Sequence, residues 1–170
     1  MRGVNAVAGS GLFLLLAPGT VAGLFPWVLT GWRVRSTGGW SGVVAGSGGV
    51  VVAVGIGVLL EQFLRFALRG HGTPAPVAPP PRLVVTGLYR YVRNPMYVAV
   101  IAILIGETLL VPSIALAVYT VVAATAMVAF ARWYEEPALL ARFGPDYRSY
   151  RATVPGWIPA RPAARPRTRG

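Results

Sequence analysis

The sequence predicts an all-α integral membrane protein: a helical bundle of about four transmembrane helices, with short cytoplasmic C-terminal helices. Three observations support this fold class. Hydrophobic residues make up 55% of the 170-residue chain and charged residues only 12%, whereas soluble domains carry about 25% charged residues. Four long apolar stretches follow one another along the chain, and nearly all arginines fall on one side of them.

The apolar stretches cover residues 4–29, 43–64, 97–112 and 113–130. A helix needs about 20 apolar residues to cross the hydrocarbon core, with some tolerance for shorter spans, and the first, second and fourth stretches meet this requirement. The third stretch is short, and only Pro112 separates it from the fourth. These two stretches therefore predict a tight helical hairpin. The first stretch is too long for the apolar part of a signal peptide, which favours a retained helix.

Arginine supplies all 16 basic residues of the chain, since lysine is absent. With four spans, both termini and the central loop share one side of the membrane, and that side holds fourteen arginines. Only Arg33 and Arg35 lie on the other side. The positive-inside rule places the arginine-rich side in the cytoplasm. The net charge of +11 then indicates anionic membrane lipids as partners, and no nucleic acid.

The chain divides into three segments. Residues 1–69 hold two N-terminal transmembrane helices, residues 70–160 hold a cofactor-binding loop, the hairpin and the cytoplasmic helices, and residues 161–170 form a disordered basic tail. Five prolines between residues 70 and 86 favour extended backbone, either as a stiff spacer or as a strap across a pocket. Gly144 and Pro145 predict the end of one surface helix and the start of another.

The residue types that are absent exclude several kinds of chemistry. Without cysteine there is no disulfide, thiolate nucleophile or zinc thiolate site. A single histidine, His71, leaves no basis for a histidine-based triad, and we expect no metal site. Without lysine there is no Schiff-base chemistry.

Two polar clusters lie at the ends of the predicted hairpin and therefore on the same side of the membrane. The first covers residues 87–97, and the second contains the adjacent acids Glu135 and Glu136. Adjacent carboxylates need a cation, which Arg93, Arg132 or a ligand with ammonium and sulfonium groups supplies. Three tyrosines in the first cluster present faces that suit an adenine ring or a sulfonium. The alternative is an interfacial belt of arginine and aromatic residues beside solvated acids.

These motifs resemble the isoprenylcysteine carboxyl methyltransferase family, which is similar to the phospholipid N-methyltransferases. The resemblance rests on residues 82–97, on the acid pair followed by Leu139, Phe143-Gly144, Tyr147 and Tyr150, and on Val154-Pro155 near the end. It covers roughly the second half of the chain. It implies a membrane methyltransferase that uses S-adenosyl-L-methionine and acts on a lipophilic small molecule carrying a carboxylate, thiol or amine.

The resemblance also implies residue roles. The expected cofactor-binding residues are Arg82, Leu83, Val84, Tyr89, Asn94, Pro95, Met96, Tyr97 and Glu135. Glu136 is the candidate general base for an amine substrate, and Arg132 and Glu107 are candidate substrate-binding residues. Asn94 stands where the family often has histidine, so it can form hydrogen bonds but cannot carry a proton. Ala131 occupies the place of a substrate-binding arginine of the eukaryotic carboxyl methyltransferases, with Arg132 beside it.

Two alternative functions and two residue roles remain to be weighed. Membrane sterol reductases share a related helical core but carry a His-x-Trp-Tyr-type segment where this chain has its acid pair, and a small non-enzymatic membrane protein predicts no cofactor. Glu61 and Arg65 fit an i, i+4 ion pair better than a functional site. Glu107 either binds a cationic substrate group or lies near the hairpin turn in water.

Overall fold

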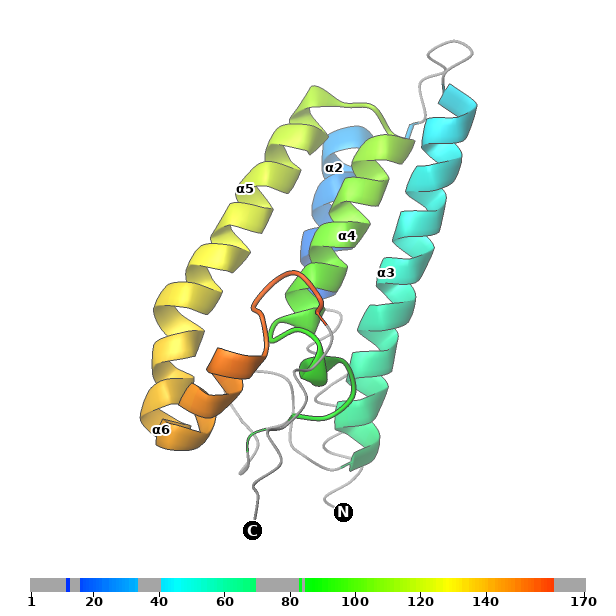
Figure 1. Cartoon of the computed structure of the whole chain (residues 1–170). Coiled ribbons are helices and arrows are strands. Elements are labelled where there is room, and N and C mark those ends of the chain that lie inside the picture. The colour runs from blue at the N-terminus through cyan, green and yellow to red at the C-terminus, as the bar shows by residue number, and fades with distance from the viewer. Residues whose placement is uncertain (1–11, 13–15, 34–40, 70–82, 84, 161–170) are drawn as a thin grey trace.

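The computed structural model describes residue 12 and residues 16–33, 41–69, 83 and 85–160. The elements in these residues are all helical: the π turn η1 (Thr20–Leu24), α2 (Phe25–Thr30), α3 (Ser41–Arg69), the 3-10 helix η2 (Gly87–Arg90), α4 (Pro95–Leu110), α5 (Ile114–Phe130), the π turn η3 (Ala131–Glu135) and α6 (Glu136–Thr153). Helices α2 to α5 stand side by side, and α6 turns back beneath one end of them (Figure 1). The all-α prediction is thus confirmed for the described residues. The expectations for the start of the first stretch, most of the proline-rich loop and the basic tail fall outside them.

Helices α3 and α4 pack closely because glycines line their contact. A Cβ added to Gly106 of α4 would lie 2.7 Å from the carbonyl oxygen of Gly48, and one added to Gly55 would lie 2.7 Å from Cγ1 of Ile103. The two backbones therefore meet without intervening side chains, as helices in membranes often do. Below this seam, Leu59 and Phe63 of α3 join residues of α4 in the main apolar core.

The predicted hairpin is confirmed in α4 and α5, which are joined by only residues 111–113. The side chain of Ser113 accepts a hydrogen bond from the backbone N–H of Leu116 and so caps α5. Helix α4 has 16 residues and is therefore about 24 Å long. The N-terminal helical segment, which contains η1, contacts the hairpin: the hydroxyl of Tyr119 in α5 donates a hydrogen bond to the carbonyl of Val21 at 2.8 Å.

Two of the described helices are long and apolar enough to cross a membrane: Gly42–Arg65 within α3, and Ile114–Thr153, whose apolar part is α5. The helices Thr20–Thr30 and Pro95–Leu110 are apolar but shorter, so the total of four spans stays a prediction. Large apolar side chains point outward over much of both long helices, among them Val43, Val54, Leu64, Ile114, Val118 and Val121. Such continuous apolar surfaces are suited to contact with lipid.

Helix α6 is broken where the sequence predicts a break. Gly144 has φ of 52° and ψ of −120°, and Pro145 follows it. The left-handed φ is accessible to glycine at little cost, and proline starts the next helical turn. The two halves fold back on each other through Tyr147, Tyr150 and Val154, which pack against Leu139 and Phe143. The prediction of two short helices after the apolar region is therefore confirmed.

Candidate functional site

Tyr97 and Glu135 form the centre of the candidate site. The Tyr97 hydroxyl donates a 2.9 Å hydrogen bond to Oε1 of Glu135. Tyr97 lies in the first turn of α4, and Glu135 lies just after α5. The contact therefore joins the two ends of the hairpin, as the sequence predicts.

The π turn η3 positions the acid pair. The N–H of Glu136 bonds to the carbonyl of Ala131, five residues back, and Pro137 next to it has no N–H to donate. The missing donor loosens the helix at this point, which favours a wider turn. Glu135 and Glu136 then point at different partners.

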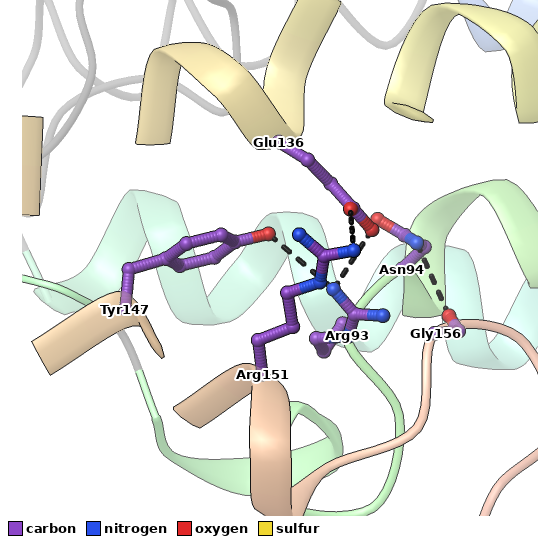
Figure 2. Close-up of polar contacts among 6 residues, drawn as sticks. All are labelled: Arg93, Asn94, Glu136, Tyr147, Arg151 and Gly156. Atoms are coloured by element: carbon purple, nitrogen blue, oxygen red, sulfur yellow. Dashed lines mark hydrogen bonds and ion pairs between the residues drawn. The ribbon is translucent and has the colours of Figure 1, made fainter. Parts of the chain in front are cut away.

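Glu136 is bound by arginines. Its Oε1 accepts from Nη1 of Arg93 at 2.8 Å, and its Oε2 lies 3.5 Å from Nη2 of Arg151. Figure 2 shows both guanidinium groups converging on this carboxylate, with the Tyr147 hydroxyl contacting the same Arg93 nitrogen that bonds Glu136. The side chains of Glu136 and Arg93 are only 13% and 14% exposed. This cluster ties the loop before α4 to both halves of α6.

The C-terminal segment is bound along the start of α4. Backbone N–H groups of Arg93 and Asn94 donate to the carbonyls of Pro155 and Gly156, at 2.8 and 3.2 Å. The Asn94 amide also donates to the Gly156 carbonyl at 3.1 Å (Figure 2). These bonds bring Trp157 over Tyr97, with ring centroids 6.3 Å apart and an interplanar angle of 27°.

The other candidate cofactor residues that the structure describes lie near the start of α4 or in the segment before it. The hydroxyl of Tyr150 donates to the Tyr89 carbonyl at 2.7 Å. Burial raises the pKa of the Tyr89 hydroxyl, and the nearby Tyr150 and Glu135 raise this pKa further, so Tyr89 is a neutral phenol. Leu83 packs on the Tyr147–Tyr150 cluster, whereas Met96 packs on the α3–α4 core. Pro95 is buried at the start of α4.

Two predicted substrate residues are not gathered at this centre. Arg132 is exposed, and the buried Ala131 beside it is only 1% exposed. Glu107 is buried in α4, ten residues after Tyr97, or about 15 Å farther along the helix axis. Arg82 and Val84 fall outside the described residues. The roles of all four stay predictions.

Sequence reasoning did not single out Trp157 as a site residue, and it left the role of Arg93 undecided between the two acids. The only sequence signal for Trp157 is its place in the Val-Pro segment that ends the resemblance. Its contact with Tyr97 depends on backbone hydrogen bonds between segments 62 residues apart, which no local pattern reveals.

The electrostatics of the site differ sharply between the two acids. Within the described residues, Glu136 has two arginine partners, whereas the hydrogen bond from Tyr97 is the contact seen for the Glu135 carboxylate. Burial raises the pKa of Glu135, and the Tyr97 hydrogen bond opposes this rise. A half-buried carboxylate beside stacked aromatic rings suits a ligand cation, by charge and by cation–π attraction.

Fold and side-chain contacts together define an apolar helical-bundle protein with a polar cluster, the candidate site, at one end. Residues 44–146 match the family model described as phospholipid methyltransferase. Since the match covers more than half of the chain, the chain belongs to the phospholipid methyltransferase family. No curated protein and no solved structure matches it. The family and the two long apolar helices indicate an integral membrane methyltransferase.

The matched region begins in α3 and ends just after the break in α6. It contains Tyr89, Asn94, Tyr97 and both acids. Trp157 and Tyr150, which contact those residues, lie beyond it.

Proposed function

We propose that this protein is a multi-pass membrane methyltransferase that uses S-adenosyl-L-methionine to methylate a lipophilic substrate. The observation that carries the proposal is Glu135: a half-buried carboxylate, oriented by Tyr97 and left without an arginine among the described residues. Membership of the phospholipid methyltransferase family supports it. The sterol-reductase and non-enzymatic alternatives have no comparable support.

The residues present fit this cofactor. Glu135 complements the ammonium of its amino-acid part, and the faces of Tyr97 and Trp157 suit the sulfonium or the adenine. Tyr89 is present as a neutral phenol, because burial raises its pKa. The side-chain amide of Asn94 donates a hydrogen bond to the Gly156 carbonyl. We therefore propose that Asn94 holds the C-terminal segment and that its side-chain oxygen can accept a hydrogen bond from a ligand.

The chain's contribution to the reaction is positioning and exclusion of water. When bound, S-adenosyl-L-methionine supplies an activated methyl group on its sulfonium. An acceptor held in line with that group reacts without further activation when it is a carboxylate or thiolate. An amine acceptor must first lose a proton. Glu136, the base predicted from sequence, is bound by Arg93 and Arg151, so we assign it an anchoring role instead.

We place the site in the cytoplasm. The ends of α3, α4 and α5 that carry the site also carry Arg65, Arg90 and Arg93 and precede the arginines of α6. The two arginines Arg33 and Arg35 follow the opposite end of the bundle, after α2. This asymmetry favours four spans with both termini inside.

Isothermal calorimetry with S-adenosylhomocysteine on detergent-purified protein tests the cofactor assignment. We expect saturable binding that weakens at least about tenfold in Glu135→Gln, because a charge-assisted contact is lost. Asp146→Asn, which neutralises an exposed acid of α6, serves as the matched control and retains wild-type affinity. Absence of binding at millimolar ligand, or equal affinity in Glu135→Gln, contradicts the proposal.

The substrate class is tested separately with membranes of the expression host. Radiolabelled S-adenosyl-L-methionine is added, and lipid extracts are compared for the wild type, Glu135→Gln and Asp146→Asn. We expect a labelled lipophilic product that only Glu135→Gln fails to make. Label confined to the aqueous phase contradicts a membrane-dissolved substrate while leaving the cofactor assignment intact.

A further inference from the structure

A hollow lies beside η2, and the residues at the centre of the candidate site do not line it. It is an open pocket of about 490 Å³ between the last turns of the apolar part of α3 and the η2 turn. We call it the α3–η2 groove. The Tyr89 carbonyl of η2 accepts a hydrogen bond from Tyr150, whereas its neighbours Leu88 and Arg90 line the groove. The turn therefore contributes to two distinct surfaces.

The end of the groove that lies farther up α3 is apolar. Gly57 and Val58 line it. Gly57 is exposed, and a Cβ added there would meet nothing within 4 Å, so the missing side chain leaves open space on this face of α3. This part of α3 belongs to the candidate membrane span Gly42–Arg65, so we expect lipid chains to contact it.

The other end of the groove is polar and carries excess positive charge. Arg65 forms an i, i+4 ion pair with Glu61, as predicted from sequence, and both line the groove with Arg90. Arg90 is exposed and forms no ion pair within the described residues. One acid against two arginines leaves a net charge of +1, which complements a single anionic head group.

The guanidinium of Arg65 lies against the backbone of Gly87. Gly87 has φ of +62°, and a Cβ there would come within 2.9 Å of Nη1 of Arg65. Only glycine both adopts this φ at little cost and leaves room for the guanidinium. The turn is thus shaped around Arg65, which stands where the apolar span ends and the head groups of the bilayer begin.

We propose that the α3–η2 groove binds an anionic phospholipid of the surrounding leaflet. Its phosphate lies between Arg65 and Arg90, and one acyl chain follows Gly57 and Val58. The order of apolar and charged lining residues along α3 matches the order of chain and head group in a lipid at this depth. This ligand is separate from the methyl acceptor, because neither Tyr97 nor Glu135 lines the groove, and its binding does not depend on the methyl donor.

Native mass spectrometry of delipidated protein in an uncharged detergent tests the proposal. Phosphatidylglycerol and phosphatidylcholine with identical acyl chains are titrated in parallel, and the first bound lipid is quantified. We expect phosphatidylglycerol to bind roughly fivefold more tightly. Arg90→Gln removes this preference, and Gly57→Leu weakens binding of the first lipid by filling the open space. Gly46→Leu, at another open glycine of α3, and Arg148→Gln, at an exposed arginine of α6, retain wild-type binding.

A second measurement separates a lipid from a soluble phosphate. Phosphatidylglycerol raises the thermal unfolding midpoint of the wild type more than that of Arg90→Gln, whereas glycerol 3-phosphate has no effect. Equal affinity for the two lipids, or unchanged phosphatidylglycerol binding in both groove variants, overturns the proposal. Equal stabilisation by glycerol 3-phosphate overturns the choice of a lipid. Binding of S-adenosylhomocysteine is measured on the same samples, so failure here is distinguishable from failure of the proposed function.

Discussion

The hydroxyl of Tyr97 donates a 2.9 Å hydrogen bond to the carboxylate of Glu135, although the two residues lie at opposite ends of the helical hairpin in the sequence. The contact orients one carboxylate oxygen at the end of the bundle. Arg93 and Arg151 pair with Glu136 instead. One acid of the pair therefore anchors the fold, and the other is oriented but electrically uncompensated within the described residues.

Removing the Tyr97 hydroxyl should weaken cofactor binding without unfolding the protein. In Tyr97→Phe the ring that stacks on Trp157 remains, but Glu135 loses the donor that orients it. We expect roughly tenfold lower affinity for S-adenosylhomocysteine, the usual scale for a hydrogen bond to a charged group. Tyr134→Phe is the matched control, because that tyrosine is 58% exposed and stacks on Phe130, away from the acid pair's partners among the described residues. Equal affinities in the two variants would refute the role of the hydroxyl.

Replacing Glu136 should affect stability more than chemistry. In Glu136→Gln the guanidinium of Arg93, whose side chain is 14% exposed, loses its charged partner. We expect the free energy of unfolding to fall by about 2–3 kcal/mol, measured by denaturant titration in detergent, with kcat retained at temperatures where the variant is folded. Asp146→Asn should change neither quantity. A large fall in kcat with unchanged stability would instead restore Glu136 as the general base.

The raised pKa of Glu135 predicts opposite effects of pH on the ligand-free fold and on binding. An acid whose pKa is higher in the folded protein binds its proton more readily when folded. Its contribution to stability is therefore present below the unfolded pKa and is lost as pH rises through the folded pKa. Binding of a cation needs the carboxylate, so affinity falls as pH is lowered through that same folded pKa. The Tyr89 phenol stays neutral, because burial raises its pKa.

The pH effect is measured as a difference between wild type and Glu135→Gln, which cancels the other titrating groups. On acidification we expect the wild type to lose affinity for S-adenosylhomocysteine at a pH above the ordinary glutamate range, while its ligand-free thermal midpoint rises relative to the variant. Parallel curves for the two proteins would show that Glu135 does not carry the charge that binds the ligand.

Much of this arrangement can be predicted from local patterns in the sequence. Pro112 between two apolar stretches predicts the hairpin, and the hairpin brings Tyr97 and Glu135 to one end. Gly144 followed by Pro145 predicts the break in α6, because glycine adopts a positive φ at little cost and proline lacks the N–H that would continue the helix. The spacing of Glu61 and Arg65 predicts their ion pair. In each case the relevant partners lie within a few residues or at the two ends of one hairpin.

The rest depends on contacts that no local pattern encodes. Adjacent acids look alike in sequence, and only the π turn at residues 131–135 decides that Glu136 faces Arg93 while Glu135 faces Tyr97. Trp157 reaches Tyr97 because the segment after α6 hydrogen-bonds to Arg93 and Asn94. The separation of Glu107 from this end follows simply from its position along α4, once that helix is known to be straight through residue 110.

The glycine contact between α3 and α4 gives a last prediction. It tests whether a glycine matters because the two helices touch there, or whether any glycine of these helices has the same effect. Gly106→Ala places a Cβ 2.7 Å from the Gly48 carbonyl oxygen and 2.7 Å from Cγ2 of Val52, so the helices must move apart. We expect a loss of about 1–3 kcal/mol in the free energy of unfolding, measured by denaturant titration in detergent. Gly46→Ala adds the same methyl group where nothing lies within 4 Å and should be neutral or slightly stabilising, since alanine favours helix. Equal effects of the two substitutions would mean that α3 and α4 do not meet at Gly48 and Gly106, and the positions of Arg65 and η2 relative to α4 would then need revision as well.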